Sequence, residues 1–164
     1  MQLGEDTITM SMTLNPVNEA AFQKAVQSLE TLNRAAVFHP TGTGKSCIAW
    51  KVVEAHPQTT FFWLVAGAQR LALRQAELTR YNGGTLPGNV RFCDCEKLAA
   101  ATPEQWVRLG EQKPGCVVLD CYHELSAVCW AQSVQKLLRM CPQAKVLGLG
   151  CLLYTSPSPR DRQK

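Results

Sequence analysis

The segment 37–47, VFHPTGTGKSC, restricts the possible folds of this chain more than any other stretch. It joins a short apolar run (35–39), which is typical of a buried strand, to a segment with helical spacing (45–56). Gly42 and Gly44 stand in the loop between these two elements. Glycines allow successive backbone N–H groups to turn inward, and a helix start adds unpaired N–H groups and a positive dipole end. The segment therefore predicts an anion-binding loop in an α/β protein.

The rest of the chain alternates apolar runs with amphipathic segments. Apolar runs predict further strands over 60–66, 89–94, 115–120 and 145–150, of which the second is more polar and edge-like. Helical spacing predicts helices over 16–33, 68–81, 95–100, 103–111 and 126–140. Apolar strands that alternate with helices indicate a parallel sheet covered on both faces. We therefore expect an α/β three-layer sandwich with a mostly parallel central sheet.

The side chains of the loop add chemistry to the anion site. Lys45 can reach the β- and γ-phosphates of a nucleotide, and the Ser46 hydroxyl can bind Mg²⁺, which prefers hard oxygen ligands. The alternative is a glycine-rich turn without a ligand, but the strand–loop–helix setting argues against it. We therefore expect a site for a nucleotide and Mg²⁺, and the resemblance described below implies that the nucleotide is ATP. The residues predicted to hold the nucleotide are Pro40, Thr41, Gly42, Thr43, Gly44, Lys45 and Ser46.

The order of the motifs resembles that of superfamily 2 helicases and translocases, the DEAD/DEAH-type group. P-T-G-T-G-K-S after an apolar strand is similar to motif I of this family, in which the first position, His39 here, varies. The segments 61–75, 90–99 and 117–127 stand where the family carries motifs Ia, Ib and II, and 145–150 lies on the strand before motif III. Within the family, the chain most resembles bacterial helicases and type III restriction-type subunits. The resemblance implies a P-loop NTPase of the RecA-like type that couples ATP binding and hydrolysis to movement on nucleic acid.

Motif II of the family reads Asp-Glu-x-His, whereas this chain reads Asp120, Cys121, Tyr122 and His123. By resemblance, Asp120 holds Mg²⁺, usually through water, and His123 couples the site to the rest of the protein, with Lys45 completing the implied catalytic set. Cys121 replaces the glutamate that activates the attacking water. A thiol is mostly neutral at pH 7, and losing a general base costs about 10²- to 10⁴-fold in rate. We therefore expect slow hydrolysis.

Nucleic-acid contacts are expected on the face that carries motifs Ia and Ib. The candidates are Gln69, Arg70, Arg74 and Lys97, which would hold the phosphate backbone of DNA in preference to RNA. The alternative is that Arg70 and Arg74 belong to the solvated face of an amphipathic helix.

The segment 151–164, CLLYTSPSPRDRQK, is rich in Ser, Pro and Arg and has no core pattern. It is expected to be either a disordered tail or translated sequencing-adapter sequence that is not native. The ATP-binding lobe then occupies residues 1–150. The resemblance implies a second RecA-like lobe as a missing partner, and its arginine finger is worth about 10³- to 10⁵-fold in rate in related hydrolases. We therefore expect the isolated lobe to be at most a weak ATPase, although its parent would be an ATP-dependent helicase.

Composition argues against several other classes of protein. The formal net charge of +4 is too small to indicate nucleic-acid binding by itself. The sequence has neither a run of about 18 apolar residues nor a basic and then apolar N-terminus, so we expect a cytoplasmic protein without a membrane partner. The eight cysteines contain no C-x-x-C pair. Reduced and mostly buried thiols are therefore favoured over a zinc site.

Two other functions stay open. The first is a nucleotide-binding, hydrolysis-deficient regulatory module that acts through partners, which Cys121 favours. The second is a P-loop kinase or another transferase, which is disfavoured because D-x-x-H after the fourth predicted strand fits a helicase better.

Overall fold

The computed structural model describes residues 13–39, 44–120 and 128–151. Five strands form one sheet in the order β1-β5-β4-β2-β3, and every neighbouring pair is parallel. The strands are β1 (Arg34–His39), β2 (Phe61–Val65), β3 (Val90–Asp94), β4 (Cys116–Asp120) and β5 (Lys145–Cys151). The expected parallel sheet is confirmed, and it contains no antiparallel pair within the described residues.

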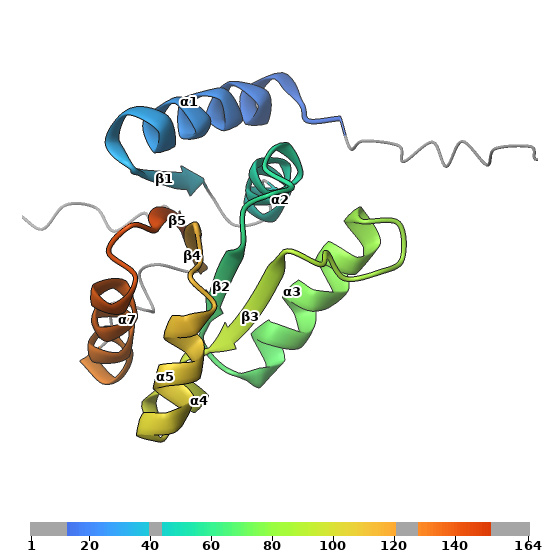
Figure 1. Cartoon of the computed structure of the whole chain (residues 1–164). Coiled ribbons are helices and arrows are strands. Elements are labelled where there is room, and N and C mark those ends of the chain that lie inside the picture. The colour runs from blue at the N-terminus through green and yellow to red at the C-terminus, as the bar shows by residue number, and fades with distance from the viewer. Residues whose placement is uncertain (1–12, 40–43, 121–127, 152–164) are drawn as a thin grey trace, which may run out of the picture.

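Helices cover both faces of this sheet (Figure 1). They are α1 (Pro16–Leu32), α2 (Lys45–Ala55), α3 (Ala68–Tyr81), α4 (Cys95–Ala99), α5 (Pro103–Glu111) and α7 (Val128–Met140). Helices α1, α2 and α3 share one hydrophobic core with the sheet, whereas α4, α5 and α7 share the other. This arrangement confirms the predicted three-layer α/β sandwich.

The two cores meet at β2, whose five residues are all buried. Trp63 packs into the core that includes Leu78 of α3. Its neighbour Phe62 points to the opposite face and packs into the core that includes Trp106 of α5 and Leu137 of α7. Because each large apolar side chain contributes about 1.5–3 kcal/mol when fully buried, β2 is the centre of the packing.

Local capping signals fix where two of the helices begin. The side chain of Asn15 accepts a hydrogen bond from the backbone N–H of Asn18 at 2.8 Å, with Pro16 in the first turn of α1. At α5, Thr102 and Gln105 form a reciprocal capping box. These polar residues explain why the helices start close to the predicted positions.

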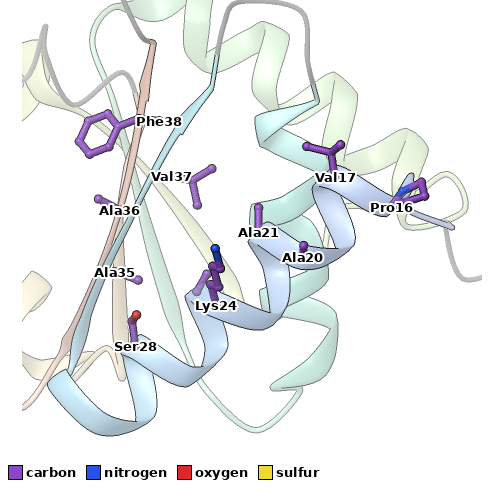
Figure 2. Close-up of a pocket in the computed structure, with 11 residues that line it drawn as sticks. Pro16, Val17, Ala20, Ala21, Lys24, Ser28, Ala35, Ala36, Val37 and Phe38 are labelled. Atoms are coloured by element: carbon purple, nitrogen blue, oxygen red, sulfur yellow. The ribbon is translucent and has the colours of Figure 1, made fainter.

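The first strand differs from its prediction. Residues 35–39 were expected to be buried, but β1 lies at an edge of the sheet, where Ala36 is exposed and Phe38 is 47% exposed (Figure 2). Val37 is buried. An apolar run predicts a strand, but it cannot show whether a neighbouring strand covers both of its sides. The edge position predicted for the third strand is confirmed, because β3 ends the sheet on the other side.

The structure also shows where the tryptophans and cysteines lie. Trp50, Trp63 and Trp106 are buried and pack in the two cores. Cys93, Cys95, Cys116 and Cys141 are buried free thiols. Within the described ranges, no cluster of three or more His, Cys, Asp or Glu residues could hold a metal, and no helix is long and apolar enough to cross a membrane.

Candidate functional site

The start of α2 has the geometry of an anion site. Gly44 is the N-cap residue, with φ of 84°, and it has no side chain to cap the helix. This φ lies in the left-handed region that favours glycine, and a Cβ at Gly44 would lie 3.1 Å from Nδ2 of Asn18. Lys45 and Ser46 are the first two residues of the helix. The early N–H groups of an α-helix lack intrahelical acceptors, so this end of α2 can bind a negative charge.

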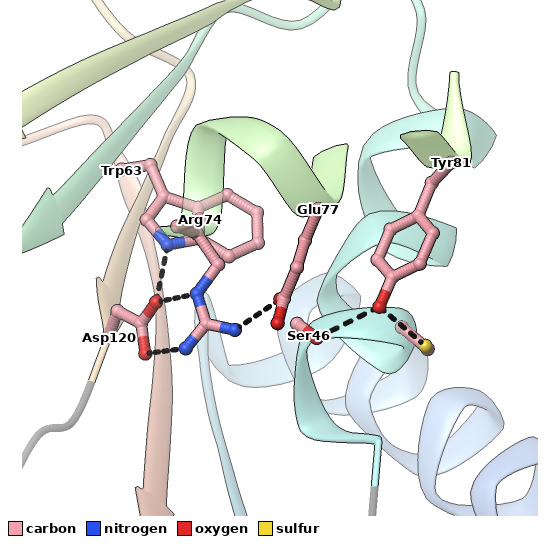
Figure 3. A network of polar contacts seen from close by, with 7 residues as sticks. Ser46, Trp63, Arg74, Glu77, Tyr81 and Asp120 are labelled. Atoms are coloured by element: carbon pink, nitrogen blue, oxygen red, sulfur yellow. Dashed lines mark hydrogen bonds and ion pairs between the residues drawn. The ribbon is translucent and has the colours of Figure 1, made fainter. Parts of the chain in front are cut away.

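Asp120 lies at the carboxyl end of β4 and is 3% exposed. Its Oδ2 accepts hydrogen bonds from Nε1 of Trp63 at 2.9 Å and from Nε of Arg74 at 2.5 Å. Its Oδ1 accepts a further bond from Nη2 of Arg74 at 3.1 Å (Figure 3). The buried carboxylate therefore forms a bidentate ion pair with Arg74 and accepts a hydrogen bond from the indole of Trp63.

Arg74 also reaches a second carboxylate on its own helix. Its Nη1 donates to Oε2 of Glu77 at 2.6 Å. Burial lowers the pKa of Arg74, but the charges and hydrogen bonds of Asp120 and Glu77 outweigh that effect and raise the pKa above its ordinary value. Arg74 therefore stays protonated and joins β4 to α3 through a charged network.

Ser46 and Cys47 face the other end of α3. The Ser46 hydroxyl lies 3.4 Å from the hydroxyl of Tyr81, and Sγ of Cys47 donates to the same Tyr81 oxygen at 3.2 Å (Figure 3). Partial burial raises the pKa of Tyr81, and the hydrogen bond with Cys47 and the charge of Glu77 act in the same direction. Tyr81 is therefore a neutral phenol near neutral pH, and it contacts the Ser46 hydroxyl, which could bind a metal ion.

The residues present fit a magnesium ion, as a count of lone pairs shows. An ionised carboxylate has about four acceptor positions, and Trp63 and Arg74 use three of those on Asp120. One position on Oδ1 is left for a water molecule in the shell of the ion. The long contact of Ser46 with Tyr81 is weak, so this hydroxyl can turn toward a ligand. Ser46 and Asp120 would hold Mg²⁺, although the positive charge of Arg74 weakens the attraction of Asp120 for it.

The structure places the predicted nucleic-acid residues in two different settings. Gln69, Arg70 and Lys97 are exposed, and they lie on α3 and α4, just after the carboxyl ends of β2 and β3. Buried Asp94 joins these two helix starts, because its Oδ1 accepts from the N–H groups of Gly67 at 3.2 Å and Glu96 at 2.9 Å. These three contacts stay predictions.

Arg74 lies in the second setting. Its guanidinium binds Asp120 and Glu77 with three of its nitrogens, and its side chain is 23% exposed. Its contact with nucleic acid stays a prediction. The sequence does not show that a buried carboxylate lies opposite.

Sequence reasoning missed Trp63, Glu77 and Tyr81 as parts of this site. A signal was present for two of them, since Arg74, Glu77 and Tyr81 follow one face of α3 at positions i, i+3 and i+7. In the structure, this face of α3 lies against Asp120 and Ser46. Trp63 offered no signal apart from its place in an apolar run.

Other predicted site residues lie outside the described part of the chain. They are Pro40, Thr41, Gly42 and Thr43 of the loop, and Cys121 and His123 after β4. Their roles stay predictions.

Comparison with known proteins gives a likeness in structure but no match in sequence. No protein-family model matches the chain, and no curated protein matches it. Among solved structures, domain III of the Thermotoga maritima replication initiation protein DnaA is similar, with a TM-score of 0.46 and 12% sequence identity. The match covers 92% of this chain and 57% of that one. The chain thus spans a little over half the length of this structure.

Proposed function

We propose that this chain binds ATP with Mg²⁺ at the start of α2, as the first RecA-like lobe of a nucleic-acid helicase or translocase. The topological switch point of the sheet carries this proposal. The connection that follows β1 packs on one face of the sheet, and the connection that follows β4 packs on the other. Open α/β sheets bind ligands outside the carboxyl ends of their strands at such a point. Lys45, Ser46 and Asp120 lie at that edge.

Each of these residues has a role that its chemistry supports. The first N–H groups of α2 would bind the phosphates, and Lys45 would place its positive charge on the β- and γ-phosphates. Ser46 and Asp120 would hold the magnesium ion, which would neutralise part of the phosphate charge. Gln69, Arg70 and Lys97, at the carboxyl edge, would contact the backbone of nucleic acid, DNA in preference to RNA.

A second candidate is a nucleotide-binding module that does not hydrolyse its ligand and acts through partners. Two observations favour it. The carboxylate of Asp120 is largely neutralised by Arg74, which reduces its use as a metal ligand. In addition, Cys121 replaces the glutamate that activates water in the family that the chain resembles. A missing general base slows hydrolysis by about 10²- to 10⁴-fold, but it leaves binding intact.

An ATPase assay separates these two candidates. The purified chain is expected to hydrolyse ATP slowly, and Cys121→Glu is expected to raise the rate by at least about tenfold, because it restores a carboxylate base. Cys121→Gln is the matched control, since it has the same length but cannot accept a proton. A rate that rises with added DNA supports the helicase lobe. If Cys121→Glu binds ATP but stays as slow as Cys121→Gln, the module that acts through partners is favoured instead.

A further inference from the structure

Arg74 lies between two carboxylates that come from different elements (Figure 3). Its Nε and Nη2 donate to Asp120 at the end of β4, and its Nη1 donates to Glu77, which is one turn further along α3. The Asp120 side chain is 4% exposed, whereas the Glu77 side chain is 29% exposed. All three nitrogens of the guanidinium therefore have a carboxylate acceptor, and the positive charge of Arg74 is shared between a buried partner and a more exposed one.

The bidentate pair limits how a metal ion can reach Asp120. Hard divalent cations such as Mg²⁺ prefer oxygen ligands, and an ionised carboxylate offers about four acceptor positions. Trp63 and Arg74 occupy three of these positions. While Arg74 keeps both of its bonds, the carboxylate can therefore contact the ion only through a water molecule on Oδ1, and the guanidinium opposes any closer approach.

The charges act in the same direction as these bonds. Arg74 carries a full positive charge beside a buried carboxylate, so solvent screens its repulsion of a divalent cation only weakly. Glu77 acts against this repulsion, because its carboxylate accepts from the same guanidinium at 2.6 Å. The effect of Glu77 is smaller, since its side chain is more exposed and its charge is better screened. The affinity of Asp120 for a cation therefore depends on both residues.

We propose that Arg74 and Glu77 are positioning residues that set the affinity of Asp120 for a divalent cation. Arg74 lowers this affinity by binding both carboxylate oxygens and by repelling the ion, and Glu77 raises it by neutralising part of the charge of Arg74. This role depends on the proposed site for ATP and Mg²⁺, and it implies an order of binding. The ion alone binds weakly, whereas the negative charge of the phosphates offsets Arg74, so the metal and the nucleotide enter together.

A titration with Mg²⁺ alone, without nucleotide, tests these roles. The Nε1–H group of Trp63 donates to Oδ2 of Asp120 at 2.9 Å, so its NMR signal, identified by its loss in Trp63→Phe, reports on this carboxylate. Arg74→Met is expected to lower the Mg²⁺ concentration at the midpoint at least about tenfold, because it removes a positive charge at ion-pair distance and frees both oxygens. Glu77→Gln is expected to raise that concentration at least about threefold, because the charge of Arg74 then opposes the ion in full.

Opposite shifts in these two variants distinguish the proposed roles from a purely structural one. Both substitutions break the same charged network, so a structural role alone predicts weaker Mg²⁺ binding in both. Arg80→Met is the matched control, because it removes the same charge from an exposed position on α3, and it is expected to change the midpoint by less than about twofold. Arg74→Gln replaces Arg74→Met if that variant fails to fold. It still donates a hydrogen bond but has no charge, and the same tenfold shift is expected.

Three results would overturn these roles: an Mg²⁺ midpoint that is unchanged or higher without the charge of Arg74, a lower midpoint in Glu77→Gln, or a Trp63 signal that Mg²⁺ shifts in no variant. A parallel titration with ATP separates such a result from a failure of the proposed function. If the chain binds ATP with Mg²⁺ but Arg74→Met leaves the Mg²⁺ midpoint unchanged, the roles of Arg74 and Glu77 are wrong and the nucleotide site is supported. If Arg74→Met binds Mg²⁺ more tightly but ATP binds to neither protein, the nucleotide site is wrong and the control of cation affinity is supported.

Discussion

Arg74 binds both carboxylate oxygens of Asp120, although the two residues are 46 positions apart in the sequence. The distances are 2.5 Å from Nε to Oδ2 and 3.1 Å from Nη2 to Oδ1. The Asp120 side chain is 4% exposed, so this carboxylate has little access to water. The pair compensates the desolvation of Asp120, and it fixes helix α3 over the carboxyl end of β4.

Removal of the Arg74 guanidinium is expected to destabilise the fold. Breaking a buried ion pair from one side costs about 3–5 kcal/mol, and because the Arg74 side chain is 23% exposed we expect about 2–3 kcal/mol for Arg74→Met. The free energy of unfolding in urea measures this loss. Arg80→Met, on the same helix, removes an exposed guanidinium that lies over the ring of Tyr81 and is expected to cost less than about 1 kcal/mol. Equal losses from the two variants would contradict the stabilising role of the Arg74–Asp120 pair.

The indole of Trp63 provides a second test of the same carboxylate. Trp63→Phe removes the hydrogen bond from Nε1 to Asp120, and hydrogen bonds to charged groups contribute about 1.5–3 kcal/mol. Trp50→Phe is a close control, because Nε1 of Trp50 is buried and has no hydrogen-bond partner within the described residues. Both substitutions lose similar volume from the core. We expect unfolding experiments to show the larger loss for Trp63→Phe, and a larger loss for Trp50→Phe would argue against the Trp63 bond.

The buried thiols predict how stability changes at alkaline pH. Burial raises the pKa of Cys93, Cys95 and Cys116 to about 12, compared with an ordinary value of 9.0. The folded chain therefore keeps protons that the unfolded chain releases, and stability is expected to fall as the pH rises from about 9 to about 12 and to be unaffected by these groups below pH 9. Urea midpoints measured across this range test the prediction. Cys116→Ala should reduce the slope by about one proton, and an unchanged slope would contradict it.

The fold follows from local patterns because those patterns are strong here. The helix predicted over 68–81 is found at the same residues, and each predicted strand is found within one or two residues at each end. The order of the strands in the sheet could not be predicted from these local patterns. Nothing in residues 145–150 indicates that β5 lies between β1 and β4, because apolar runs do not specify which neighbour they pair with. The same limit explains why β1 was expected to be buried.

The candidate site was predictable where the chemistry is local. Lys45 and Ser46 were placed correctly at the start of a helix because they follow a glycine, and Asp120 at the end of a strand because it closes an apolar run. Their binding roles stay predictions. The ion pair of Arg74 with Asp120 could not be predicted, because the two residues lie 46 positions apart in the sequence. The polar network therefore depends on the tertiary fold.

The titration of ATP in the presence of Mg²⁺ tests the central claim most directly. The chain is expected to bind ATP, and Lys45→Ala is expected to lose about 1.5–3 kcal/mol of binding free energy, which weakens affinity by more than about tenfold. Lys51→Ala is the control, because Lys51 lies on the same helix and pairs with Glu54 at 3.2 Å. It is expected to bind ATP as the unmodified chain does. Undetectable binding to the folded chain, or equal affinity of Lys45→Ala and the unmodified chain, would contradict a nucleotide site at the start of α2.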